Sequence, residues 1–143
     1  MNSNTSIPFN RVTVSFGSNY GDRRANVETA LEWFKSIAFD IQSSSVYETP
    51  EVHGYGDLYM NAVAKGSLRL DHDTFNSLTK QYELDHGRNR ERRCRGEVPI
   101  DIDIVVWNKI VMRPKDFTSS FFQQGLNEIY SQQKDLDCGE SEF

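Results

Sequence analysis

The chain has 143 residues, of which 37% are hydrophobic and 26% charged, and its formal net charge is −5. This length suits one domain, which can bury roughly 70% of its unfolded surface without disulfide or metal support. The composition excludes a disordered chain, and the short apolar runs exclude a transmembrane helix. We therefore expect a cytoplasmic single domain over residues 1–143, with its core at about 11–126 and flexible termini at 1–10 and 127–143.

The charges are unevenly distributed along the chain. The last nine residues carry four acids and no base, whereas five arginines lie within eight residues. Because the net negative charge disfavours nucleic acid and anionic membranes, the arginine cluster indicates a small polyanionic ligand. Cys94, inside this cluster, and Cys138, in the acidic tail, lack metal-ligand spacing and are expected to be free thiols. The five arginines are Arg88, Arg90, Arg92, Arg93 and Arg95.

The first half of the chain predicts three strands and one helix. Residues 11–17 alternate between apolar and polar side chains, which predicts a half-buried strand. Residues 23–38 follow turn and N-cap residues and carry an apolar stripe at helical spacing. Further strands are expected at 41–47 and 59–68, with a loop at 51–57 between them.

The second half completes a recognisable order. A helix is expected to start at Asp71 or Asp73 and to end near Gly87, followed by a polar loop at 88–98 and a strand at 100–107. The order β-α-β-β-α-β predicts an α+β fold of the ferredoxin-like type, in which two helices cover one face of a four-stranded antiparallel sheet. Beyond this strand the pattern weakens, and we expect a short helix and a frayed tail.

The last predicted strand begins with two aspartates, Asp101 and Asp103, which alternate with isoleucines. Positions two apart on a strand share a face and lie roughly 6.6 Å apart, so both carboxylates project together while the isoleucines face the core. Such a pair suits Mg²⁺ held jointly with substrate phosphates, because the cation offsets the repulsion between the carboxylates. The alternative is a strand whose solvent face happens to carry two acids.

The arginine cluster lies in the loop that leads directly into this strand. Guanidinium groups match phosphate oxygens, so metal-binding carboxylates beside a basic loop predict a phosphoryl-transfer site. The chain has no Walker-type glycine-rich loop and no kinase signature, which excludes the common nucleotide-binding folds. The alternative for the cluster is a solvated charge run or a nonspecific nucleic-acid patch.

A third group combines aromatic rings with an amide. Aromatic faces at Tyr59, Phe121 and Phe122 can stack on a flat heterocycle, and the Asn61 amide can donate and accept hydrogen bonds at its edge. Aromatic residues at strand ends are more often core or rim residues, so this group alone predicts no ligand.

Together, five short motifs resemble the 6-hydroxymethyl-7,8-dihydropterin pyrophosphokinase family of the folate pathway. They occur in the family's order over about residues 11–108, and the family fold is also ferredoxin-like. Five ordered motifs are far more specific than any one of them. The motifs are SFGSNYGD at 15–22, VYETP at 46–50, YMNAV at 59–63, ELDHGR at 83–88 and IDIDI at 100–104.

The resemblance implies transfer of the β,γ-pyrophosphate of ATP to the hydroxymethyl oxygen of the pterin, with release of AMP. It implies that Asp101 and Asp103 hold two Mg²⁺ ions. We expect Arg88 and Arg95 to act with them in catalysis. The implied partners are ATP and hydroxymethyl-dihydropterin, bound by a monomer that contacts neither nucleic acid nor membrane.

The resemblance also assigns two sets of binding residues. The arginines are placed in a mobile loop that closes over ATP, and Ile104 is placed against adenine. The pterin-binding set is Thr49, Pro50, Val52, Tyr59, Asn61, Phe121 and Phe122. The ATP-binding set is Glu83, Arg88, Arg90, Arg92, Arg93, Ile104, Arg113 and Lys115.

The chain departs from the family pattern at the end of the arginine loop. The family loop usually ends in Trp-Gly-Pro-Arg, whereas this chain has Arg95-Gly96-Glu97-Val98. An arginine that acts on a transferring phosphoryl group can supply about 10³–10⁵ in rate, so its loss is expected to weaken the enzyme. Arg95 is the candidate to compensate. The family's downstream Pro-His element is also replaced, by the basic segment 113–117.

Two other hypotheses stay open. The first is a catalytically degenerate relative that binds a pterin, a nucleotide or a protein partner without transfer, and Glu97 and Val98 favour it. The second is an RNA-binding ferredoxin-like module, which the negative charge and the missing aromatic stacking motif disfavour. Dependence of the activity on Mg²⁺ separates the pyrophosphokinase from both.

Overall fold

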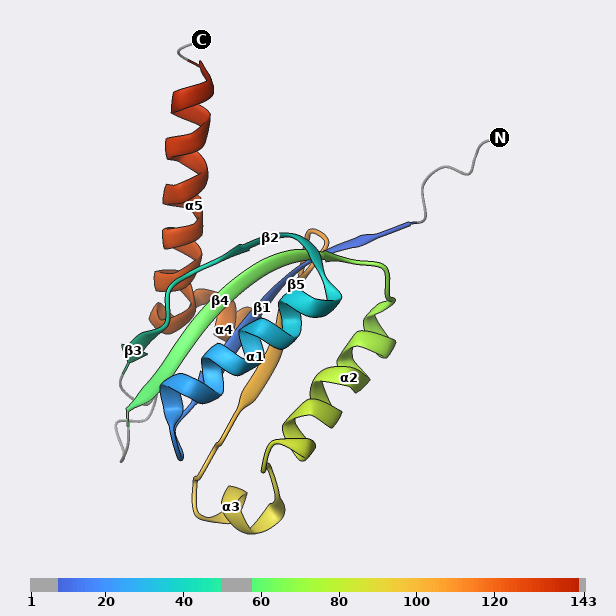
Figure 1. The fold of residues 1–143 in the computed structure, drawn as a ribbon, viewed down its shortest axis with the longest axis vertical. Coiled ribbons are helices and arrows are strands. Elements are labelled where there is room, and N and C mark those ends of the chain that lie inside the picture. The colour runs from blue at the N-terminus through green and yellow to red at the C-terminus, as the bar shows by residue number, and fades with distance from the viewer. Residues whose placement is uncertain (1–7, 50–57, 142–143) are drawn as a thin grey trace.

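The computed structural model describes residues 8–49 and 58–141, which form an antiparallel sheet with helices on both faces (Figure 1). In chain order, the elements are β1 (Asn10–Ser18), α1 (Arg23–Ile37), β2 (Phe39–Ser43), β3 (Tyr47–Thr49), β4 (Tyr59–Leu68), α2 (His72–Asp85), α3 (Arg90–Cys94), β5 (Asp101–Trp107), β6 (Ile110–Val111), α4 (Pro114–Thr118) and α5 (Ser120–Ser141).

The sheet has the topology expected from the sequence. Its strands run in the order β2-β4-β1-β5-β6, β3 also pairs with β4, and each pairing is antiparallel. Strands β1, β2, β4 and β5 with helices α1 and α2 make up the ferredoxin-like α+β unit, so that prediction is confirmed. Gly17 of β1 pairs with Asn61 of β4 on one side and with Asp101 of β5 on the other. The register therefore brings three of the sequence motifs side by side.

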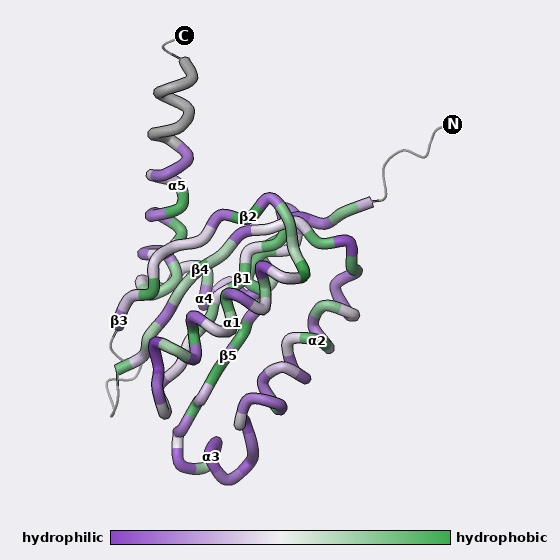
Figure 2. The backbone as a smooth tube through the Cα atoms, viewed as in Figure 1, coloured by the Kyte–Doolittle hydropathy of each residue, from purple (hydrophilic) through white to green (hydrophobic). Residues whose placement is uncertain are grey.

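Two hydrophobic cores lie on opposite faces of this sheet. The larger core packs α1 and α2 against even-numbered strand residues, such as Phe16 and Ile102. The smaller core packs α5 against odd-numbered ones, such as Val63 and Val105. Strand β4 is thus buried on both faces, which explains its imperfect alternation. The hydrophobic segments gather in the central strands, whereas α3 is largely hydrophilic (Figure 2).

Local signals fix where the two long ferredoxin-like helices begin. The side chain of Asp22 accepts a hydrogen bond from the backbone N–H of Ala25 at the start of α1. Asp71, rather than Asp73, caps α2, because its carboxylate accepts from the N–H of Thr74. These side chains satisfy backbone donors that have no partner within the helix.

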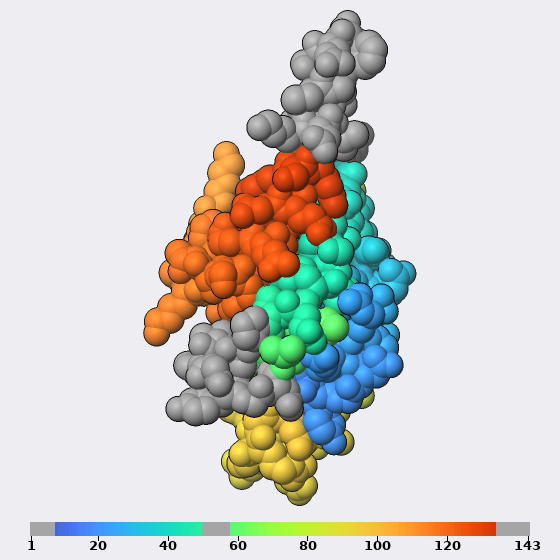
Figure 3. Space-filling view, turned by 90° about the vertical axis from the view of Figure 1, so that its left-hand side faces the viewer, coloured from blue at the N-terminus to red at the C-terminus, as the bar shows by residue number. Residues whose placement is uncertain are grey.

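The C-terminal segment differs from the expected short helix and frayed tail. Helix α5 continues to Ser141, and the buried Ile129 extends the core past residue 126. A Cβ atom on Gly125 would lie 2.6 Å from the Val63 side chain, so glycine lets the helix approach β4 closely. Figure 3 shows α5 against β2, where Gln42 Nε2 donates to Gln133 Oε1 at 2.7 Å.

Two further predictions needed correction. The expected strand at 41–47 is split into β2 and β3, because Ser44 leaves the strand path and its Oγ accepts from the N–H of Val63. The expected loop at 88–98 contains the one-and-a-half-turn helix α3, capped by the Asn89 side chain. The loop expected at 51–57 lies outside the described residues. Within the described ranges, no helix is both long and apolar enough to cross a bilayer.

Candidate active site

The acid pair lies on strand β5, on the face opposite the larger core. Ile102 between the two aspartates is fully buried in that core, as the alternation predicts. The side chain of Asp103 is 14% exposed, and that of Asp101 is 39% exposed. The carboxylates therefore sit at a partly desolvated position that opens to solvent at the Asp101 end.

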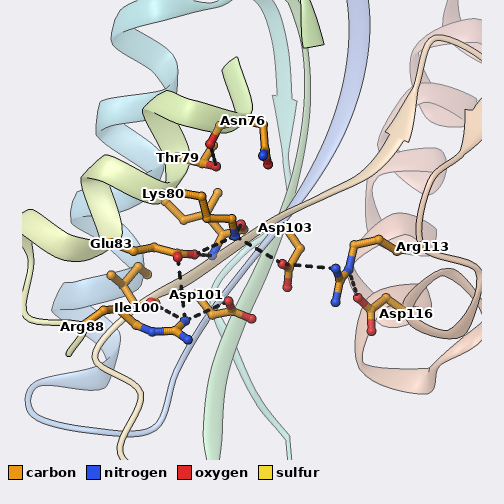
Figure 4. A network of polar contacts seen from close by, with 11 residues as sticks. Asn76, Thr79, Lys80, Glu83, Arg88, Ile100, Asp101, Asp103, Arg113 and Asp116 are labelled. Atoms are coloured by element: carbon orange, nitrogen blue, oxygen red, sulfur yellow. Dashed lines mark hydrogen bonds and ion pairs between the residues drawn. The ribbon is translucent and has the colours of Figure 1, made fainter. Parts of the chain in front are cut away.

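Three cationic side chains surround this pair (Figure 4). Arg88 Nη1 donates to Asp101 Oδ1 at 3.0 Å. Lys80 Nζ lies 3.9 Å and Arg113 Nη1 3.8 Å from Asp103 Oδ1. The cations come from α2, from the start of the arginine loop and from the segment before α4, so segments far apart in the sequence meet here. Sequence reasoning missed Lys80, although its position one helical turn before Glu83 was a usable signal.

The pKa values of the two carboxylates are shifted in opposite directions. Burial, together with the negative charge of Asp101, raises the pKa of Asp103 to about 8. Burial also acts to raise the pKa of Asp101, but the hydrogen bond from Asp103 and the charge of Arg88 outweigh it, so the pKa falls below its usual range. The pair thus shares one proton near neutral pH in the absence of a metal, as close carboxylates do when cations compensate only part of their charge.

A hard divalent cation fits this donor set. Carboxylate oxygens are the ligands that Mg²⁺ prefers, and a bound cation would replace the shared proton. Among the residues that the structure describes, no three His, Cys, Asp or Glu side chains gather into a fuller metal site. A cation bound by Asp101 and Asp103 would therefore complete its shell with water or phosphate oxygens, which is the usual arrangement for Mg²⁺ beside a nucleotide.

A cavity of about 660 Å³ lies beside the acid pair, between α2 and α3. Three of the five clustered arginines line it, which makes it suitable for a polyanion. Its lining residues are Lys80, Glu83, Leu84, Arg88, Asn89, Arg90, Arg93 and Cys94. Cys94 is exposed and has a free thiol, as predicted.

The other two arginines are held elsewhere. Arg92 Nη1 donates to the Gly87 carbonyl at 2.7 Å, and its guanidinium lies 5.3 Å from the centre of the Tyr20 ring. Arg95 Nε lies 3.2 Å from Glu97 Oε1. The structure therefore does not bring Arg92 and Arg95 to the cavity with Arg88, Arg90 and Arg93.

Asn19 ties the end of the arginine loop to the turn after β1. Its side-chain oxygen accepts from the N–H of Val98 at 2.6 Å, and its side-chain nitrogen donates to the Gly96 carbonyl at 2.9 Å. The N–H of Asn19 also donates to the Val98 carbonyl at 2.9 Å. All three bonds use the loop backbone, so they are compatible with many side chains at position 98.

The predicted pterin residues form a second group, on the other side of β1. Asn61 Nδ2 donates to Thr49 Oγ1, and both side chains are buried. A Cβ atom on Gly17 would lie 3.2 Å from Asn61 Oδ1 and 3.5 Å from the Tyr59 ring, so glycine leaves space here. Pro50 and Val52 lie outside the described residues.

Two of the predicted contact residues lie in the hydrophobic cores. Phe122 is fully buried in the smaller core, where its ring packs on Phe117. Ile104 is 6% exposed and belongs to the larger core, on the same side of β5 as Ile102. Phe121 is half-buried at the start of α5, and Lys115 is exposed on α4.

Comparison with known families decides what this arrangement belongs to. The model of the 7,8-dihydro-6-hydroxymethylpterin-pyrophosphokinase (HPPK) family matches residues 13–131, which is most of the chain. The chain belongs to the HPPK family. The matched range runs from within β1 to the first half of α5, and it includes both aspartates and the arginine loop.

Curated relatives are larger proteins. The chain is 30% identical over 103 residues to a folate synthesis bifunctional protein of Arabidopsis thaliana, covering 71% of this chain and 21% of that protein. It is 32% identical over 117 residues to the folic acid synthesis protein FOL1 of Dictyostelium discoideum, covering 80% of this chain and 18% of that protein. The chain thus spans about a fifth of the length of these relatives. A related Arabidopsis protein is named as mitochondrial.

Proposed function

We propose that this chain transfers the β,γ-pyrophosphate of ATP to the hydroxymethyl oxygen of 6-hydroxymethyl-7,8-dihydropterin, as a step of folate biosynthesis. The observation that carries the proposal is the acid pair of β5 beside an arginine-lined cavity, in a chain of the HPPK family. In this reaction the hydroxymethyl oxygen bonds to the β-phosphorus, and the bond from that phosphorus to the oxygen bridging the α-phosphorus breaks. AMP leaves with the bridging oxygen, and the hydroxyl proton is released to solvent.

The acid pair would be the metal-binding part of the site. Asp101 and Asp103 would hold Mg²⁺, and the resemblance to the HPPK family implies two ions. When bound, Mg²⁺ supplies positive charge that neutralises the phosphates and lowers the pKa of the attacking hydroxyl group. Arg88 already contacts Asp101 at 3.0 Å, so its guanidinium can pass from that carboxylate to a phosphate without a large movement.

The remaining residues would bind and orient the two substrates. Arg90 and Arg93 line the cavity and would contact ATP, while Arg113 faces Asp103 from the opposite side. We assign the pterin edge to Asn61 and Thr49, whose side chains are already hydrogen-bonded to each other. Pro50, Val52, Tyr59 and Phe121 complete the proposed pterin site. These contacts would place the hydroxymethyl group near the acid pair, since Gly17 lies between Asn61 and Asp101 in the sheet.

A weaker enzyme, or a relative that binds without transfer, is the second candidate function. The observation that favours it is the ion pair between Arg95 and Glu97, which occupies the arginine expected to compensate at the end of the loop. An arginine held by a neighbouring acid is less available to stabilise a transferring phosphoryl group. We therefore propose that transfer takes place and is slower than in relatives with an arginine at the position of Val98.

Phosphorus NMR of the products tests the proposal. The protein is incubated with ATP, MgCl₂ and the hydroxymethyl-dihydropterin, and in parallel with the pterin or the Mg²⁺ left out. The proposal predicts equal amounts of AMP and pterin diphosphate, only in the complete mixture. Formation of ADP would contradict it. Unchanged ATP, together with a rise in melting temperature on adding pterin or ATP, would favour the binding protein, and no rise with either ligand would contradict both.

A further inference from the structure

Among the residues that the structure describes, strand β5 has a neighbouring strand on only one side at the position between the two aspartates. On one side it pairs with β1 along most of its length, but on the other side β6 pairs only with Val106 and Trp107 in the described part of the chain. The backbone of Ile102, whose side chain is fully buried, thus faces α2 on its open side. A buried backbone N–H or C=O without a partner costs about as much free energy as a lost hydrogen bond.

Two side chains of α2 take the place of the missing strand (Figure 4). The N–H of Ile102 donates to Glu83 Oε2 at 2.7 Å. The carbonyl of the same residue accepts from Lys80 Nζ at 3.2 Å. Lys80 Nζ and Glu83 Oε2 lie 3.4 Å apart, so the two side chains support each other. One helical turn of α2 therefore supplies both the acceptor and the donor that a strand would offer.

We propose that Glu83, assisted by Lys80, is a positioning residue for the acid pair. It fixes the peptide groups of Ile102, which join Asp101 to Asp103 along the strand, and so sets the separation and direction of the two carboxylates. This inference rests on the proposed function, because it assigns a role to the separation of metal-binding groups. It gives Glu83 a task distinct from the nucleotide contact that the resemblance to the family implied.

The environment of Glu83 supports a structural task of this kind. Its side chain is 7% exposed, and its other oxygen, Oε1, lies 3.9 Å from Arg88 Nη1. Arg88 in turn donates to Asp101 and to the Ile100 carbonyl, at 3.0 and 3.3 Å. A buried carboxylate is costly unless it is paired and hydrogen-bonded. Glu83 meets that condition through Ile102, Lys80 and Arg88, all of which belong to or touch the acid pair's strand.

The experiment compares Glu83→Ala with Glu83→Gln. Both variants remove the negative charge, but only glutamine keeps an oxygen that can accept from the Ile102 N–H. Two quantities are measured on the nucleotide-free protein: amide hydrogen exchange at Ile102 by NMR, and the dissociation constant of Mn²⁺ by electron paramagnetic resonance. Gln81→Ala, an exposed change on the same helix, is the matched control.

For Glu83→Ala we expect faster exchange at Ile102 and Mn²⁺ affinity weakened about tenfold, which is the usual cost of losing a residue that orients metal ligands. For Glu83→Gln we expect both quantities to stay within about threefold of the unchanged protein, since the hydrogen bond is kept. If Glu83→Ala does not fold, Glu83→Met replaces it, because methionine has a similar volume and no oxygen.

Two results would overturn the inference. The first is exchange and Mn²⁺ affinity that are unchanged in Glu83→Ala. The second is equal impairment of both Glu83 variants, since the charge and not the hydrogen bond would then matter. If the protein without substitutions binds no Mn²⁺, that result instead contradicts the proposed function. The exchange rate at Ile102 in the Glu83 variants then still decides whether Glu83 fixes the peptide.

Discussion

The acid pair and the arginine loop are two halves of one candidate site, and they are held in place by different means. The acid pair stands on a strand that is paired with β1 and anchored by isoleucines in the larger core. The arginine loop stands on α3, where none of the five residues Arg90–Cys94 is buried. Sheet pairing and core burial resist local opening far more than exposed helical turns do. The proposed metal-binding half is therefore preformed, whereas the proposed nucleotide-binding half can rearrange around a ligand.

The bonds within the loop support this contrast. Arg95 pairs with Glu97, and Arg92 bonds back to the Gly87 carbonyl, so part of the loop's basic charge is directed at the loop itself. In the described part of the chain, hydrogen bonds of Asn19 with the backbone of Gly96 and Val98 tie the far end of the loop to the turn after β1. Changes to the acid pair should consequently abolish transfer, and changes to the loop should tune it.

Removal of either carboxylate should have the largest effect. In Asp101→Ala or Asp103→Ala we expect the rate of AMP release to fall about 10³-fold, because several kcal/mol of charge stabilisation by the bound metal are lost. The rate is measured with saturating ATP, pterin and MgCl₂. Asp73→Asn, a fully exposed acid at the start of α2, is the control and should be indistinguishable from the unchanged protein. If both alanine variants release AMP at a rate comparable to that of the unchanged protein, the acid pair has no part in the mechanism.

Arg88 joins the two halves, so its loss should have the next largest effect. In Arg88→Ala we expect kcat/KM for ATP to fall about 10²-fold, since a charge-assisted contact to phosphate and the support of Asp101 are lost together. Arg88→Lys should recover only part of this, because lysine cannot replace a planar guanidinium. Steady-state kinetics with ATP varied provide the test, and equal activity of the alanine and lysine variants would argue against a specific contact.

A change at the end of the loop should raise activity. Because Val98 is held through its backbone N–H and carbonyl, Val98→Arg keeps the bonds to Asn19 while adding a guanidinium. We expect AMP release to increase about tenfold, which is a modest share of what a well-placed arginine can supply. Val98→Met, which adds length without charge, is the matched control. If both variants behave like the unchanged protein, position 98 does not limit the reaction.

The smallest expected effect is on stability in the absence of metal. The pKa of Asp103 is raised from its ordinary value of 3.8 to about 8, so between these values the native state keeps a proton that the unfolded state has lost. Proton binding by Asp103 therefore stabilises the native state at pH 4, and this stabilisation is lost as the pH rises to about 8. We predict that the melting temperature of Asp103→Asn, relative to the unchanged protein, rises over this range in EDTA. A difference that stays constant with pH would contradict the buried, proton-sharing pair.

The parts of this structure that follow local patterning were predictable from the sequence. The alternation around Asp101 and the stripe of the first helix depend on residues close in the chain, and both gave the correct elements. The second core was not predicted, because Val63 and Phe122 meet through pairing across the sheet and the packing of α5. For the same reason the burial of Phe122 was not predicted: it depends on a helix that the weak pattern after residue 108 did not define.

The site itself divides in the same way. The shared face of the aspartates follows from strand geometry. The family motif that contains them spans only residues 100–104, so it can be read directly from the sequence. The contacts of Lys80 and Glu83 with Ile102 could not be predicted from spacing, since they depend on how α2 lies along an open strand edge. The ion pair of Arg95 with Glu97 was equally hidden, because proximity in sequence does not say which of several acids an arginine will contact.

Hydrogen exchange measured by mass spectrometry, with and without MgATP, tests the central contrast most directly. We predict that peptides covering β5 are protected in both states, whereas peptides covering residues 88–98 exchange quickly in the free protein and become protected when MgATP is added. Protection of the arginine loop in the free protein, or protection of β5 only after MgATP is bound, would contradict a preformed acid pair beside an adaptable loop.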